Sequence, residues 1–227
     1  MEYSFASREE ASLAAAQRIG ANLIRRIDSD ERAALVVSGG TTPGQCFSYL
    51  SQIDLDWSNV FVVPSDERWV PPHNDDSNEK QIRERLLQNF AVDAQLVPLV
   101  DMASDISSRC ATLGEDLGRL PMPFACCLLG MGTDGHFASL FSDAVNLDEG
   151  LELDNSRFCI PVTTASSSHQ RISLTLTALT RSEEVILLVF GEEKRQVYKQ
   201  AKAGDVALPV THLLQQQRVP VSVYWAP

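Results

Sequence analysis

The sequence lacks several patterns that would define its class at once. None of its apolar runs approaches the ~20 residues that a membrane-spanning helix requires. Its five cysteines include no C-x-x-C pair, the spacing that is typical of zinc sites and thiol–disulfide exchange. Basic residues number 19 against 30 acidic residues, and the net charge of −11 argues against a nucleic-acid-binding surface. We therefore expect no membrane partner, no nucleic-acid partner and no metal.

What is present indicates a globular cytoplasmic protein. The chain has 227 residues, 44% of them hydrophobic, which is enough to bury a sizeable core. An odd number of cysteines suggests reduced thiols and hence the cytoplasm. Glu2, Arg8, Glu9 and Glu10 place charges where a signal peptide would be apolar, so we expect none.

Short apolar runs alternate with segments of helical periodicity along the whole chain. Strands are expected at residues 33–37, 59–63, 96–99, 124–129, 158–162, 171–176, 185–190 and 221–225. This alternation predicts an α/β fold: a doubly wound, mostly parallel Rossmann-like sheet with helices on both faces, in a single domain spanning residues 1–227. The acidic segment 142–155 is expected to be an irregular surface loop.

The most informative stretch is a glycine-rich turn after the apolar run at 124–129. Gly130, Gly132 and Gly135 give the backbone unusual freedom, and Asp134 and His136 follow within it. A neutral imidazole can accept a proton near neutral pH, and a neighbouring carboxylate can fix its tautomer. Residues Gly130–His136, here the base turn, therefore predict a general base at a strand end. A tight turn with a purely structural histidine is the alternative.

A second turn, residues Ser38–Gly44, predicts an anion site and is here called the anion loop. It joins a buried strand to a helix, so free backbone amides and the positive end of the helix dipole point at one place. Pro43 suits the first helical position, and Thr42 with Gln45 can form a capping box. The loop matches neither the P-loop nor the dinucleotide motif. An ordinary strand–helix turn is the alternative to phosphate binding by Gly39, Gly40, Thr41 and Thr42.

Two further strand ends contribute charge. Asp66, Glu67 and Arg68 follow the strand at 59–63, and Lys194 follows the strand at 185–190. Right-handed crossovers bring these loops to the carboxyl edge of the sheet, beside the anion loop and the base turn. Arg68 and Lys194 would meet an anion, whereas Glu67 is expected in an internal ion pair and His169 in solvent. The residues thus predict a cofactor-free hydrolase or isomerase acting on a small phosphorylated molecule.

Several segments together resemble the 6-phosphogluconolactonase family, in order along the chain: Ser38–Pro43, Asp66–Pro71, Asp76–Asn78, Leu129–Phe141, Arg171–Thr175 and Gly191–Lys194. The resemblance implies hydrolysis of 6-phospho-D-glucono-1,5-lactone to 6-phospho-D-gluconate in the oxidative pentose phosphate pathway. It implies a fold shared with glucosamine-6-phosphate deaminase and ribose-5-phosphate isomerase. It also implies His136 as the general base, with Asp134 and Asp66 as catalytic partners and Arg171 among the substrate-binding residues, in a monomer or small homo-oligomer without cofactor.

The chain departs from the family pattern at a few positions. Thr41 stands where serine is usual, and Ser142 where proline is usual. Residues 166–170, directly before Arg171, replace a commonly proline-rich stretch, so the family pattern does not define how Arg171 contacts the substrate.

Two rival functions remain. Glucosamine-6-phosphate deaminases share the loops but carry a carboxylate five residues after the histidine, where this chain has Phe141. A non-catalytic sugar-phosphate-binding protein would have no need of the Asp134–His136 pair.

Overall fold

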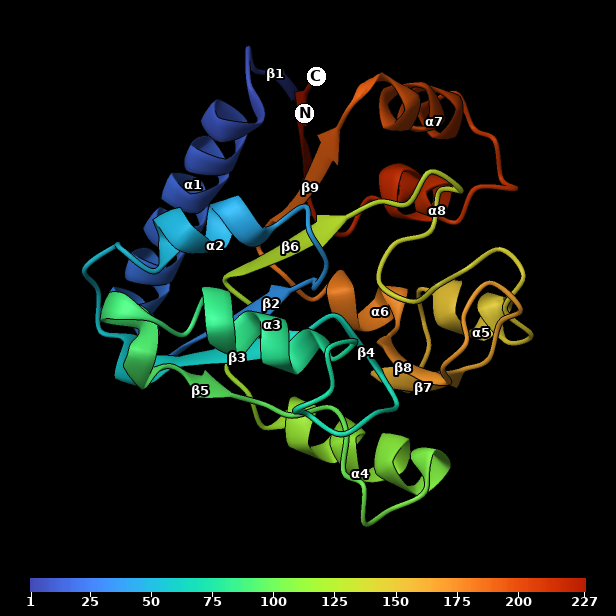
Figure 1. The fold of residues 1–227 in the computed structure, drawn as a ribbon, viewed down its shortest axis with the longest axis horizontal. Coiled ribbons are helices and arrows are strands. Elements are labelled where there is room, and N and C mark those ends of the chain that lie inside the picture. The colour runs from blue at the N-terminus through green and yellow to red at the C-terminus, as the bar shows by residue number, and fades with distance from the viewer.

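The computed structural model describes every residue from Met1 to Pro227 and contains one large sheet with helices on both sides (Figure 1). Leaving the edge strand β1 aside, the strand order corresponds to the doubly wound order 3-2-1-4-5-6. All neighbouring strands in this sheet are parallel, and their order is β1 (Glu2–Ser4), β10 (Val221–Ala226), β9 (Val185–Phe190), β6 (Cys126–Gly130), β2 (Ala33–Val37), β3 (Val60–Pro64) and β5 (Gln95–Leu96). Among the helices, none combines the length and apolar character needed to cross a bilayer.

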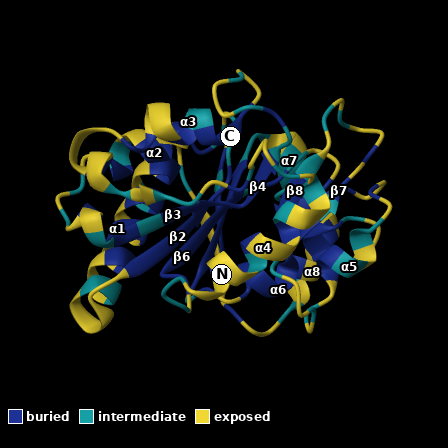
Figure 2. Cartoon of the chain, turned by 90° about the horizontal axis from the view of Figure 1, so that it is seen from below, coloured by how far each residue is buried: buried dark blue, intermediate teal, exposed yellow.

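Two hydrophobic cores lie on opposite faces of this sheet (Figure 2). One core contains α1 (Arg8–Asp30), α2 (Gly44–Leu50) and α3 (Asn78–Arg85). The other contains α4 (Ile106–Gly118), α7 (Glu192–Lys202) and α8 (Val210–Gln215). Strand β2 is buried throughout, because its successive side chains enter the two cores alternately: Leu35 joins the first, and Ala34 and Val36 the second. The predicted doubly wound α/β fold is confirmed.

A second, smaller sheet was not predicted. Strands β4 (Asp66–Arg68), β8 (Arg171–Leu174) and β7 (Cys159–Val162) form it, and both of its pairings are antiparallel. No helix separates β7 from β8, so the two strands pair as neighbours instead of crossing over to a parallel position. The segment after β3, expected to be a loop, pairs with β8 instead, and Arg68 lies opposite Arg171. This sheet places charged residues from distant segments together beyond the end of β3.

Other differences from the sequence predictions are local. The segment 142–155 contains a short helix, α5 (Leu147–Leu151), and the strand expected at 171–176 ends at Leu174, before α6 (Leu176–Leu179). Short 3-10 helices occur at Trp57–Asn59 and Asn89–Asp93. Pro43 is the residue that precedes α2, and no side chain caps that helix, so the predicted Thr42–Gln45 capping box is wrong. A single domain over residues 1–227 remains a proposal, which the continuous sheet from β1 to β10 supports.

Candidate active site

The predicted site residues gather where the strand order reverses. From β2 the chain proceeds toward β3, and from β6 toward β9, so the loops after these adjacent strands diverge and leave a crevice. A pocket of about 240 Å³ lies there, lined by Ser38, Gly39, Gly40, Thr41, Thr42, Asp66, Arg68, Asn78, Gly130, Met131, Gly132, His136, Ala138, Arg171 and Lys194. Every predicted site residue except Asp134 lines this pocket. A larger cavity of about 560 Å³ between α4 and β7 holds none of them.

The base turn holds an Asp–His pair. His136 Nδ1 lies 2.6 Å from Asp134 Oδ1, and the hydrogen bond from the imidazole lowers the pKa of Asp134. We assign the proton to Nδ1, since a carboxylate accepts it there, which leaves Nε2 as the basic nitrogen. Gly132 is required in this turn because a Cβ atom would overlap both Asp134 and the imidazole. The pair is therefore arranged as a base with an orienting carboxylate.

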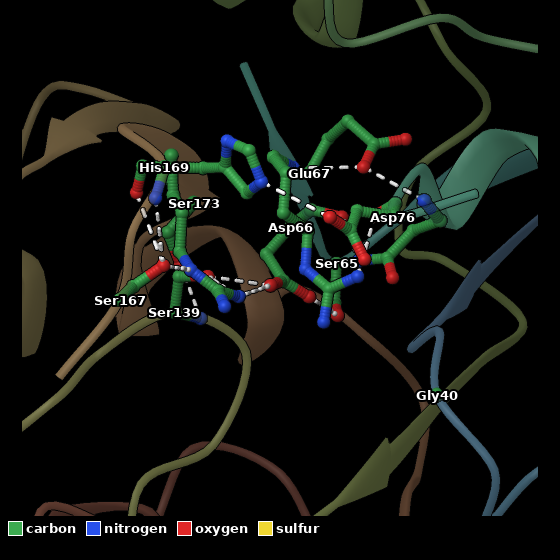
Figure 3. Close-up of polar contacts among 12 residues, drawn as sticks. Gly40, Ser65, Asp66, Glu67, Asp76, Ser139, Ser167, His169 and Ser173 are labelled. Atoms are coloured by element: carbon green, nitrogen blue, oxygen red, sulfur yellow. Dashed lines mark hydrogen bonds and ion pairs between the residues drawn. The ribbon is translucent and has the colours of Figure 1, made fainter. Parts of the chain in front are cut away.

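Asp66, the first residue of β4, is held by hydrogen bonds and an ion pair to residues from three separate segments (Figure 3). Its carboxylate, 5% exposed, accepts hydrogen bonds from Ser65 Oγ at 3.0 Å and Ser139 Oγ at 2.5 Å. Arg171 Nη1 lies 3.6 Å from the same carboxylate and donates to Ser139 Oγ at 3.3 Å. Both carboxylate oxygens are thus engaged, which suits Asp66 to fixing Arg171. Its role as a proton acceptor remains a prediction.

Two of the three pocket cations have no carboxylate partner. No acidic oxygen lies within 4.0 Å of Lys194 or Arg68, whereas Arg171 pairs with Asp66. Arg68 Nη1 donates to the backbone oxygen of Asp76 at 2.5 Å. Burial lowers the pKa of Lys194, and nearby Arg8 lowers it further. A phosphate in the pocket would compensate both effects, because an opposite charge favours the protonated amine.

Backbone amides of the anion loop add neutral donors. The N–H groups of Gly39, Thr41 and Thr42 donate to no protein acceptor, and neither does that of Met131 in the base turn. Unpaired amides that surround a pocket form a site for an anion. Gly40 lines the pocket too, but its amide already donates to Gln81 Oε1 at 2.9 Å. In the anion loop, the amides of Gly39, Thr41 and Thr42 are therefore free to bind an anion, and that of Gly40 is not.

Glu67 does not form the internal ion pair expected from the sequence. Its carboxylate, 2% exposed, accepts from the backbone N–H groups of Arg68, Asn78 and Glu79 at 2.6–2.7 Å and from Ser77 Oγ at 3.0 Å. A carboxylate suits the N-terminus of α3, where amides lack partners and the dipole is positive. Burial nevertheless raises its pKa, against the lowering effect of these hydrogen bonds. Glu67 thus joins β4 to the start of α3.

His169 is not free in solvent, contrary to the expectation from the sequence. Its Nε2 lies 3.0 Å from Asp76 Oδ2, so it links the β7–β8 connection to the segment before α3 (Figure 3).

The glycines of the base turn, Gly130, Gly132 and Gly135, have the G-x-G-x-x-G spacing of dinucleotide-binding turns, which the sequence analysis did not consider. No helix follows them, however, since α5 begins only at Leu147, and the helix N-terminus that holds a pyrophosphate is missing.

Comparisons with known proteins identify the family of this chain. Residues 6–225 match the family model described as glucosamine-6-phosphate isomerases/6-phosphogluconolactonase. A 6-phosphogluconolactonase from Mesorhizobium japonicum is 38% identical, over 99% of this chain and 94% of its own length. The crystal structure of a 6-phosphogluconolactonase from Shewanella baltica superposes with a TM-score of 0.94 at 36% identity, covering 100% of this chain and 97% of that one.

A more distant structure shares the fold. A monomeric glucosamine-6-phosphate deaminase has a TM-score of 0.75 at 20% identity, covering 98% of this chain and 96% of that one, a likeness of fold alone. The family and fold predicted from the sequence are confirmed. The chain belongs to the glucosamine-6-phosphate isomerase/6-phosphogluconolactonase family.

Proposed function

We propose that the protein hydrolyses 6-phospho-D-glucono-1,5-lactone to 6-phospho-D-gluconate, in the oxidative pentose phosphate pathway. The observation that carries the proposal is the Asp134–His136 pair, which stands beside a pocket with unpaired cations and amides. Relatives named 6-phosphogluconolactonase support the assignment over nearly the full length of the chain.

The pocket suggests how the reaction proceeds. Lys194, Arg68 and the free amides of the anion loop hold the phosphate, while His136 Nε2 takes a proton from the water that attacks C1. Negative charge then grows on the carbonyl oxygen, and Asp134 stabilises the imidazolium. As the bond between C1 and the ring oxygen breaks, the imidazolium returns the proton to that oxygen. Water and lactone thus become the hydroxy acid without a covalent intermediate.

The direct test measures proton release from freshly prepared phosphogluconolactone against its spontaneous hydrolysis. We expect acceleration that is unchanged by prolonged treatment with a chelator, since the proposed steps use only side chains of this protein. Activity that disappears on chelation and returns with added zinc would contradict this mechanism. Failure of the wild-type protein to accelerate hydrolysis would contradict the function itself.

The deaminase alternative gives a different expectation. Phe141 stands where that family needs a carboxylate for ring opening; its ring centroid lies 4.2 Å from that of His136, and a phenyl ring cannot transfer protons. Incubation with glucosamine 6-phosphate should therefore release no ammonia above the rate without protein. Sustained ammonia release would favour the deaminase assignment, and loss of that release in His136→Ala would exclude a contaminating enzyme.

The remaining proposals concern the setting of the reaction. We infer a cytoplasmic monomer or small homo-oligomer that acts on a small sugar phosphate, with neither nucleic acid nor membrane as a partner. The net charge of −11 disfavours both polyanionic surfaces. All five cysteines are buried and unpaired, as in proteins of reducing compartments.

A further inference from the structure

One face of α3 contacts the anion loop at its three glycines, Gly39, Gly40 and Gly44. Asn78, Gln81 and Arg85 are spaced i, i+3 and i+7, so they lie on the same side of the helix. A Cβ atom on Gly39 would overlap Asn78 Oδ1, and one on Gly44 would lie 2.6 Å from Arg85 Nη1. Between them, Gln81 Oε1 accepts the amide of Gly40. The loop therefore lies directly against this helix face.

We propose that Gln81 and Asn78 are positioning residues that hold the anion loop in the shape that turns its free amides toward the phosphate. The proposal rests on the proposed function, because it takes the bound anion to be the substrate phosphate. Gln81 does not line the pocket. Asn78 does line it, but its amide nitrogen donates to the backbone oxygen of Asp66 and its amide oxygen lies against Gly39, so we assign it to support of the loop.

Gln81 acts through a single hydrogen bond. Its Oε1 lies 2.9 Å from the amide nitrogen of Gly40, whose φ of +87° belongs to the region that glycine tolerates. That bond directs the Gly40 amide away from the pocket and toward α3. On either side, the amides of Gly39 and Thr41 remain without acceptors. Fixing the middle residue of the turn thus defines where its neighbours point.

Asn78 supports the same turn by packing against Gly39. It is 3% exposed, and its Nδ2 donates to the backbone oxygen of Asp66 at 2.8 Å. Its Oδ1 has no hydrogen-bond partner and lies against Gly39. A buried acceptor without a donor is destabilising, so its presence needs an explanation other than stability. Here the side chain is hydrogen-bonded to β4 and packs against the anion loop, whereas an apolar residue of that size could only pack.

The helix that carries these residues is itself fixed at its N-terminus. The buried Glu67 carboxylate binds the first amides of α3, and Ser77 caps the helix by accepting from the Lys80 amide at 3.2 Å. Because Glu67 also accepts from the amide of Arg68, one carboxylate sets the position of a pocket cation and of the helix behind the anion loop. Arg68 and the anion loop, the two parts of the proposed phosphate site, are thereby held in a fixed position relative to each other.

The test replaces Gln81 by methionine, which keeps its length and helix propensity but removes the acceptor. Loss of one hydrogen bond should raise KM for 6-phosphogluconolactone about three- to tenfold, with kcat nearly unchanged. For unphosphorylated gluconolactone, kcat/KM should not change. Gln88→Met is the matched control, because Gln88 is exposed and its side chain donates only to the backbone oxygen of Arg83. Gln81→Glu retains the acceptor but adds a negative charge that would repel the phosphate. At about 0.5 M salt this charge is screened, and KM should equal that of the wild type at the same salt concentration.

Each contrary outcome overturns the inference. Unchanged KM in Gln81→Met would show that the bond does not shape the loop, and lowered KM would show that Gln81 merely competes with phosphate for the Gly40 amide. Equal losses on both lactones would indicate a general defect. Calorimetric titration with inorganic phosphate gives the same comparison without turnover: weaker binding is expected in Gln81→Met but not in Gln88→Met. It therefore tests the inference even if the wild-type protein fails to hydrolyse the lactone.

Discussion

The variant His136→Ala should lower kcat for 6-phosphogluconolactone by about 10²–10⁴-fold, the usual contribution of a positioned base. KM should change little, because the proposed phosphate contacts come from Lys194, Arg68 and the anion loop. The measurement is proton release under saturating substrate, corrected for spontaneous hydrolysis, on a variant whose circular dichroism matches the wild type. A near-normal kcat would remove His136 from the mechanism and make Asp66 the next base to test.

Asp134→Asn is the companion variant, and its loss should be smaller because Asp134 only orients and stabilises the imidazole. The pH dependence of the two proteins adds a second check. Because the hydrogen bond from the imidazole lowers the pKa of Asp134 below the usual value, the carboxylate stays ionised at mildly acidic pH and continues to orient the imidazole there. The ratio of the wild-type rate to the Asp134→Asn rate should therefore be constant from about pH 5 to 8. A ratio that falls on acidification within this range would show that Asp134 loses its charge there.

Removing a pocket cation should have the next largest effect. Lys194→Ala and Arg68→Ala should each raise KM for the phosphorylated lactone by about tenfold to a hundredfold, since a hydrogen bond to a charged group contributes about 1.5–3 kcal/mol. The affected contact lies away from the reacting carbon, so kcat should fall much less. Steady-state kinetics on phosphorylated and unphosphorylated gluconolactone separate the two effects. Equal losses on both substrates would show that these cations do not recognise the phosphate.

Two controls sharpen this experiment. Lys199→Ala removes an exposed lysine from the same helix and should leave KM unchanged. Because the pKa of Lys194 is lowered, the amine loses its proton at a lower pH than an ordinary lysine, and KM should rise on the alkaline side. Lys194→Arg, whose guanidinium stays charged, should reduce that alkaline rise. An identical alkaline profile in the two proteins would assign the rise to another group.

The sequence carried enough information to predict the large sheet and most of the pocket. Strands β2 and β9 were predicted with their observed bounds, because an apolar run between polar turns is unambiguous when both faces are buried. The doubly wound order then requires the turns after β2 and β6 to meet, and so it brings His136 to the anion loop. Parallel topology, rather than any contact visible in the sequence, made the site predictable.

What could not be predicted depends on contacts between distant segments. Strand β4 has three charged residues and no apolar alternation, so only its pairing with β8, more than 100 residues away in the chain, makes it a strand. The partners of Glu67 are mostly backbone amides, which leave no trace in residue identity. The Gly40 amide is likewise taken by Gln81 for reasons of side-chain placement. Strand β1 is a short edge segment fixed by its neighbour β10.

The meeting of the anion loop and the base turn on adjacent strands has a consequence for substrate length. Parallel strands are held about 4.8 Å apart by backbone hydrogen bonds, and Ser38 Oγ further ties the two loops by accepting the Gly130 amide at 3.1 Å. The separation between the free amides of the anion loop and the start of the base turn is therefore set by the backbone. A fixed separation favours substrates with one number of carbon atoms between phosphate and carbonyl. We therefore expect a phosphorylated lactone one carbon shorter to be hydrolysed with a lower kcat/KM, as steady-state kinetics would show.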